Sequence, residues 1–165
     1  MILGMSTSAF TLFHVVISLI AIVAGFVVAV MMLGSKVSDG WTATFLATTA
    51  LTSITGFPFP RDHVLPSHIV GVISLLVLIV ACAALYGYRL ARSWRWIYVA
   101  SALTALYLNV FVGVVQSFQK LAFLRALAPT QSEAPFLVAQ VLVLALFIVL
   151  GIVAVKRFRP LASAP

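Results

Sequence analysis

The sequence predicts an all-α protein, a polytopic transmembrane bundle of five helices that forms a single domain. Of its 165 residues, 64% are hydrophobic and 8% are charged, and the mean hydropathy is +1.22. A soluble domain of this size could not hide so much apolar surface, because small folds leave much of their chain exposed. The long apolar runs reach the ~20 residues that cross a hydrocarbon core, and only short connections separate them.

The first two spans are expected at about residues 9–33 and 41–57. A break containing Gly34 ends the first run. The Phe57-Pro58-Phe59-Pro60 segment ends the second, because proline disfavours helix at the preceding residue and removes a backbone donor. The second segment is short, so the alternative to a full span is a re-entrant segment that lies beside protein. It carries a face of small polar residues, which we interpret as a packing face rather than a conduction path; the face consists of Thr44, Thr48, Thr52 and Thr55.

The third span is expected at about residues 66–88 and the fourth at about 94–118. Pro66 suits the first turn of a helix, where its missing N–H costs nothing. Ser93, in the basic turn between the two spans, is a predicted cap for the fourth. An amphipathic extension through Arg125 is expected after the fourth span.

The fifth span is expected at about residues 133–155, capped by Ser132, and residues 156–165 form a short tail. Cytoplasmic segments of membrane proteins carry an excess of lysine and arginine. With five spans, seven basic residues fall on one side and three on the other: Lys36, Arg89, Arg92, Arg95, Lys156, Arg157 and Arg159 against Arg61, Lys120 and Arg125. The N-terminus is therefore predicted outside and the C-terminus in the cytoplasm.

This topology brings the polar residues of the spans to the outer half. His14 lies in the outer part of span one, His63 in the outer connection, and His68 in the first turn of span three. On span four, Asn109 and Gln116 belong to a stripe that includes Gly113 and Lys120, with spacings of four, three and four that share one helix face. Gln140 lies in the outer half of span five. Amides in hydrocarbon need partners, so this stripe is expected to face the bundle.

Three interpretations of this group remain open. The first is a ligand site, either haem b held by His14 and His68 or a metal ion held by His14, His63 and His68, since imidazole suits both. Gly71 and Gly113 would then admit a flat macrocycle. The second is a pocket for a quinone-like molecule or small metabolite. The third is structural, with histidines that cap helix ends or bond across helices.

Several classes of function are disfavoured. The acids are Asp39, Asp62 and Glu133, none in the middle of a span, whereas a proton-coupled pump normally needs an intramembrane carboxylate. No catalytic motif is found, and no residue set indicates catalysis. The basic residues lie beside the spans, which indicates a role in membrane orientation rather than nucleic-acid binding. The alternative to ligand binding is an accessory or assembly subunit that contacts other membrane proteins or itself.

Four stretches of the chain resemble a family of small proteobacterial multi-pass membrane proteins to which no activity is assigned. They are TSITGFPFP at residues 52–60, WRWIY at 94–98, ALYLNVFV at 105–112 and LAPTQSE at 127–133. The resemblance implies a bacterial inner membrane, so that the outer side and the N-terminus would be periplasmic, and it brings no functional residues with it.

Overall fold

The computed structural model describes residue 2, residues 4–59 and residues 66–160. The described part is a bundle of helices, which confirms the all-α prediction for these residues. Its elements are α1 (Thr7–Leu33), α2 (Asp39–Gly56), α3 (Pro66–Cys82), the π-helical turn η1 (Ala83–Gly87), α4 (Trp94–Lys120), α5 (Ala122–Leu127) and α6 (Ala134–Arg157).

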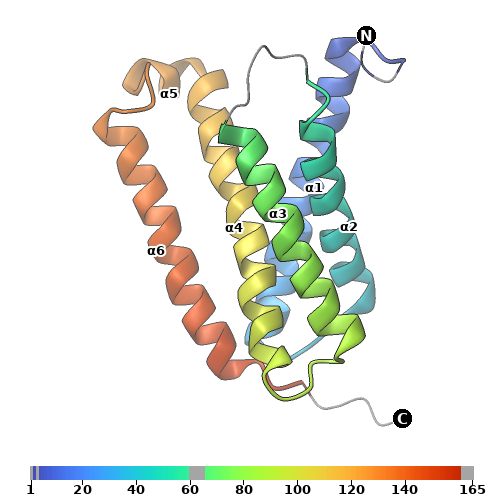
Figure 1. The fold of residues 1–165 in the computed structure, drawn as a ribbon. Coiled ribbons are helices and arrows are strands. Elements are labelled where there is room, and N and C mark those ends of the chain that lie inside the picture. Colours follow the sequence, from blue (N-terminus) through green and yellow to red (C-terminus); the bar gives the residue numbers. More distant parts are fainter. Residues whose placement is uncertain (1, 3, 60–65, 161–165) are drawn as a thin grey trace.

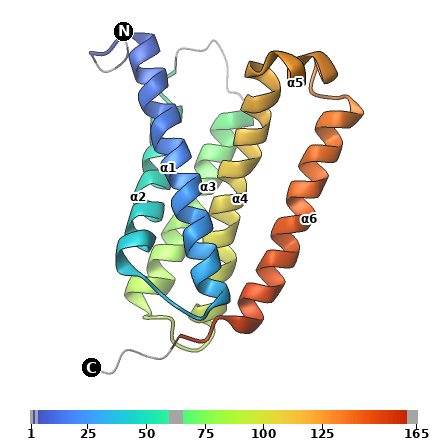
Figure 2. The same ribbon diagram turned by 180° about the vertical axis from the view of Figure 1, so that it is seen from behind.

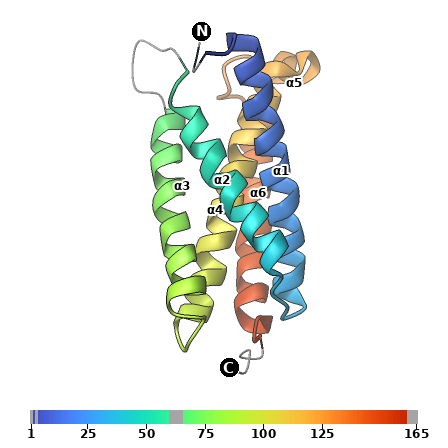
Figure 3. The ribbon, with the colours of Figure 1, turned by 90° about the vertical axis from the view of Figure 1, so that its right-hand side faces the viewer.

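The long helices run alternately up and down along one direction, so that α1 begins at the upper end of the bundle and α6 finishes at the lower end (Figure 1). Helices α1 to α4 form a closed group in which α1 packs on α2, α2 on α3, α3 on α4 and α4 on α1. The pair α1–α2 is the most extensive of these contacts (Figure 3). Helix α6 lies at the edge of the group, packed on α4 and more weakly on α1 (Figure 2).

Four helices of the described chain are long and apolar enough to cross a membrane: Thr7–Leu33, His68–Gly87, Trp94–Lys120 and Ala134–Arg157. These four helices indicate a membrane protein. Helix α2 is not among them, because it is rich in threonine and less apolar. Its 18 residues correspond to about 27 Å, slightly less than the ~30 Å of a hydrocarbon core.

Some helix boundaries differ from the predicted ones, and the structure shows the physical reason. Helix α1 begins at Thr7, two residues early, because the Ser6 hydroxyl caps it by accepting from the Ala9 N–H at 3.2 Å. The third span leaves the α-helical form after Cys82 and finishes as the π-helical turn η1.

The ends of α4 and α6 also differ from the prediction. Helix α4 continues to Lys120, and the expected amphipathic extension is a separate short helix, α5. Ser93 occupies the N-cap position of α4 but makes no capping hydrogen bond there. The residue before α6 is Glu133 rather than Ser132, and its carboxylate accepts from the backbone N–H groups of Thr130 and Ser132, each at 3.1 Å.

Hydroxyl residues are buried on two faces of α2, of which only one was predicted. Its buried hydroxyl residues are Thr42, Thr49, Ser53 and Thr55. Thr44, from the predicted face, is exposed and donates to the Gly40 carbonyl of its own helix at 2.8 Å. Residues 42, 49 and 53 share one face, whereas residues 44 and 55 lie about 200° and 220° around the helix from residue 42. Small residues of α2 do serve helix packing: Thr55 on the predicted face, and Thr42, Thr49 and Ser53 on a face that was not predicted.

The segment that follows α6 ties the lower end of the bundle together. The Arg95 guanidinium donates to the Phe158 carbonyl and, at 3.4 Å, to the Val155 carbonyl. The Phe158 side chain is buried beside Tyr98, with ring centroids 5.9 Å apart. The Arg159 N–H donates to the Ser35 hydroxyl at 2.6 Å, in the connection between α1 and α2. The base of α6 is thus fixed to both α4 and the end of α1.

Candidate functional site

His14 lies about two turns into α1 and is half-buried. Its Nδ1 atom is 2.8 Å from the Thr55 Oγ1 atom on α2. The Thr55 hydroxyl also lies 2.7 Å from the Leu51 carbonyl, to which it donates as helical threonines commonly do. Because a hydroxyl has one hydrogen, the Thr55 oxygen must accept from His14 Nδ1–H. The neutral His14 ring therefore carries its proton on Nδ1 and a lone pair on Nε2.

Both described histidines contact the aromatic residues that follow α2. The Phe59 ring meets the His14 ring edge to face, with centroids 5.4 Å apart and an interplanar angle of 86°. The Phe57 ring stacks on the His68 ring, with centroids 5.7 Å apart and an angle of 14°. His14 and His68 therefore lie at the same end of the bundle, beside one short segment of chain. Each contacts a different phenylalanine, so aromatic side chains fill part of the space around them.

The metal site predicted from three histidines stays a prediction. His63 and Asp62 fall outside the described residues. In the part of the chain that the structure does describe, no group of three or more histidine, cysteine, aspartate and glutamate side chains is arranged to hold a metal ion. A bare metal ion would thus need a ligand from the connection between α2 and α3.

The glycines that we expected to admit a macrocycle accommodate side chains of this protein. A Cβ atom on Gly71 would lie 3.3 Å from Phe57 Cζ, so the absence of a side chain lets the Phe57 ring approach α3. A Cβ atom on Gly113 would meet Ile22 Cδ1 at 3.6 Å, which is ordinary contact. One turn along α3 from Gly71, Ser74 is buried and its hydroxyl has no partner among the described residues.

Asn109 joins α4 to α2 in the interior of the bundle. Its Nδ2 group donates to the Thr49 Oγ1 atom at 3.0 Å, and Thr49 is completely buried. One turn further along α2, the buried Ser53 hydroxyl donates to the Thr49 carbonyl at 3.0 Å. The pair supplies the interhelical partner that an amide needs in hydrocarbon, and it confirms that Asn109 faces the bundle. Thr49 and Ser53 were not among the predicted site residues.

Replacing Asn109 with leucine should destabilise the bundle by about 0.5–2 kcal/mol, the range measured for interhelical hydrogen bonds in membranes. The loss should appear as a lower unfolding midpoint in detergent. Gln116→Leu is the matched control, because Gln116 is exposed on the same helix. In the double variant Asn109→Leu/Thr49→Val the two effects should be less than additive, since they remove the same bond. Full additivity would contradict the pairing.

The other two amides of the predicted group differ from Asn109. Gln116, two turns further along α4, is exposed, so the prediction that it faces the bundle is wrong. Residues 109 and 116 share a helix face, so the difference comes from what lies opposite it: Thr49 of α2 lies opposite Asn109, whereas nothing among the described residues buries Gln116. Gln140 is half-buried on α6, where its Nε2 group donates to the Phe111 carbonyl of α4 at 3.3 Å. Its buried Oε1 atom has no partner among the described residues.

No family model, no curated protein and no solved structure matches this chain. The functional residues are therefore inferred from the geometry of the side chains. At the end of the bundle where α2 finishes, that geometry consists of His14 held by Thr55, His68 stacked on Phe57, and Phe59 against His14.

Proposed function

We propose that the protein spans a bacterial inner membrane five times, with its N-terminus in the periplasm and its C-terminus in the cytoplasm. The proposal adds α2 to the four apolar helices. Its support is the course of α2, which runs beside α1 in the opposite direction (Figure 3). The distribution of basic residues and the resemblance to small proteobacterial membrane proteins support the orientation and the membrane.

Reporter fusions at the two ends test this topology. A phosphatase that works only in the periplasm should be active when fused before Met1, and a cytoplasmic fluorescent reporter should be bright when fused after Pro165. The reciprocal pair of fusions is the control and should be silent. Two ends on the same side would mean that α2 does not cross, and the five-span proposal would be abandoned.

We further propose that the periplasmic end binds a metal centre, haem b or a metal ion, through Nε2 of His14. The observation that carries this proposal is the Nδ1–H bond from His14 to Thr55. Metal-ligating histidines almost always donate their second ring nitrogen to a neighbouring oxygen, which fixes the tautomer and directs the lone pair at the metal. A quinone carbonyl is itself an acceptor, so this tautomer of His14 favours a metal over a quinone.

Haem b is the version that needs the fewest protein ligands. His14 and His68 would hold the haem iron, which would supply electron-transfer chemistry at this end of the bundle. Both rings contact the segment after α2, and Phe57 and Phe59 would supply apolar walls to a flat macrocycle. A metal ion would require His63 as a third ligand. The pocket is thus proposed as His14, His68 and His63, with Asn109 and Gln140 in the interior below it.

The experiment is an absorption spectrum and a metal analysis of the purified full-length protein. Haem b would give a Soret band and, on reduction, separated α and β bands. A metal ion would give a stoichiometric metal content without a Soret band. A protein that contains neither, even after reconstitution with haem or with divalent metals, would end the ligand proposal.

An accessory or assembly subunit is the second candidate, and a different observation favours it. His14, Asn109 and Gln140 each already have a partner on another helix, as purely structural polar residues do. Helix α6 is also the least buried of the four apolar helices. Under this proposal the histidines only fix helix contacts. The protein would then co-purify with another membrane protein in fixed stoichiometry and carry no metal.

A further inference from the structure

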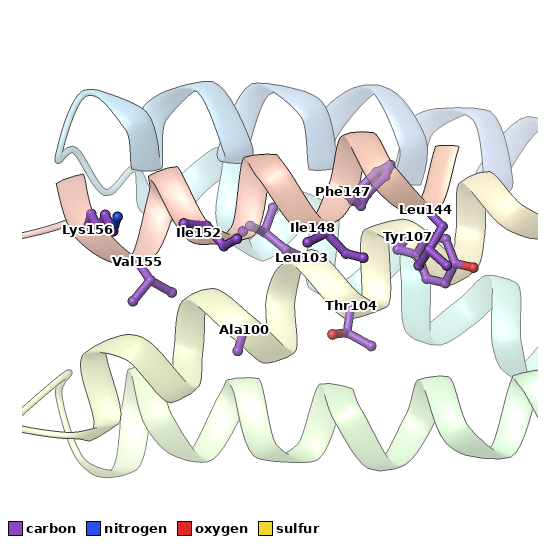
Figure 4. Close-up of a pocket in the computed structure, with 11 residues that line it drawn as sticks. Ala100, Leu103, Thr104, Tyr107, Leu144, Phe147, Ile148, Ile152, Val155 and Lys156 are labelled. Carbon is purple, nitrogen blue, oxygen red and sulfur yellow. The ribbon is translucent and has the colours of Figure 1, made fainter. Parts of the chain in front are cut away.

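A groove lies between α4 and α6 in the lower half of the bundle, away from the histidines. Its volume is about 480 Å³, within the range of small-molecule sites. It is lined mostly by apolar side chains. The lining includes Ala100, Thr104 and Tyr107 of α4 and Leu144, Gly151 and Lys156 of α6. Figure 4 shows Lys156 at one end of the groove and Tyr107 with Leu144 at the other.

The dimensions of the groove match one leaflet of a bilayer. From Leu144 to Lys156 the helix rises about 18 Å, and one leaflet of the hydrocarbon core is about 15 Å thick. Lys156 is in the last turn of α6, where the apolar span ends. A chain lying in the groove would therefore run from the interface to the middle of the membrane.

The groove is too small to enclose a transmembrane helix. A helix with its side chains is about 10 Å across, so an 18 Å length of it fills roughly 1,400 Å³. That is about three times the volume available, whereas a single hydrocarbon chain is much thinner. No side chain narrows the groove at Gly151, and a Cβ atom built there would meet no atom within 4 Å.

The charge at the mouth of the groove identifies the head group. Lys156 is exposed at the end of the bundle that carries seven of the ten basic residues. Within residues 4–59 and 66–160, Asp39 is the one acidic residue at that end. Basic pockets between transmembrane helices at the cytoplasmic face bind anionic lipid head groups, and each lysine near the surface contributes about 1 kcal/mol.

We propose that this groove binds an anionic glycerophospholipid, with one acyl chain between α4 and α6 and its phosphate at Lys156. The site is separate from the proposed metal centre and does not depend on it. The lipid would fill the gap that the tilt of α6 leaves beside α4 and would hold α6 against the rest of the bundle.

Native mass spectrometry of the delipidated full-length protein, titrated with defined compounds, tests the proposal. Phosphatidylglycerol should bind as a single tight molecule, about fivefold more tightly than phosphatidylcholine of the same chains. Inorganic phosphate should not compete, because it lacks the chain. Gly151→Phe should weaken both lipids at least about tenfold by displacing several methylene groups. Ala145→Phe, on an exposed part of α6, is the control and should bind as the wild type does.

The head-group contact is tested separately. Lys156→Gln should abolish the preference for phosphatidylglycerol, and Arg157→Gln should keep it, because only Lys156 lines the groove. If Gly151→Phe fails to fold, Ala100→Phe blocks the same groove from α4. Equal wild-type affinity for the two lipids overturns the head-group assignment. Either of two results overturns the site itself. One is unchanged lipid binding in a folded variant whose groove is blocked, and the other is a wild-type dimer that becomes a monomer when the groove is blocked.

Discussion

The protein with His14 replaced by alanine should purify without its metal centre. Under the proposed function, His14 Nε2 is a direct ligand, so its removal leaves a single described histidine, His68, which cannot hold the centre alone. The loss should be complete by metal analysis and, for haem b, by absence of the Soret band. His68→Ala then distinguishes haem b from a metal ion. A haem would stay bound through His14 alone with a changed absorption spectrum, whereas a metal ion would lose one of its three histidine ligands.

Thr55→Val should weaken metal binding without abolishing it, an effect that a purely structural role of His14 does not produce. The valine keeps the shape of the side chain but cannot accept the Nδ1–H bond, so the orientation and tautomer of His14 are no longer fixed. Loss of such a partner typically lowers metal affinity about 10–100-fold. Thr44→Val is the matched control, because the Thr44 hydroxyl is exposed and bonds only within its own helix.

The two functional candidates give opposite patterns in this series. If the histidines are structural, Thr55→Val and His14→Ala should lower the unfolding midpoint by similar amounts, and their effects should not add. No metal should be lost, because none would be bound. Metal content that survives His14→Ala in a folded protein would exclude the ligand role of His14.

The sequence predicted the helices well because their strongest determinant is local. Apolar runs of membrane length, punctuated by Gly34, Pro58 and Pro129, define segments that match five helices of the structure to within a few residues. The errors at the boundaries come from interactions that a run of residues does not display. Ser6 starts α1 early through a side-chain cap, and the third span changes to a π-helical turn before it ends.

The candidate site was predicted less completely, because its geometry depends on pairs of residues far apart in the chain. Periodicity identified the polar face of α4, but only the packing of α2 decides that Asn109 is paired and Gln116 exposed. Thr49 was not predicted as a site residue, because it lies outside the predicted stripe of four threonines. The groove between α4 and α6 had no sequence signal, because it depends on the tilt of one apolar helix relative to another.

Gly25→Leu should be the most destabilising substitution in the core of the bundle. A Cβ atom at this position would clash with Leu106 Cδ1 on α4 and would lie 2.9 Å from Phe45 Cε2 on α2. Both neighbours are 1% exposed, so neither can move aside without displacing others.

The expected loss of stability is about 3 kcal/mol or more, the upper range for overpacked cores. It exceeds the roughly 1 kcal/mol that replacing a glycine gains in helix propensity. Gly40→Leu, in the first turn of α2 and away from the groove, is the control: its Cβ meets no atom within 4 Å, so the unfolding midpoint in detergent should not fall. Adding Leu106→Ala to Gly25→Leu should recover part of the loss by vacating the space. A Gly25→Leu protein as stable as the wild type would mean that α1, α2 and α4 do not meet at Gly25.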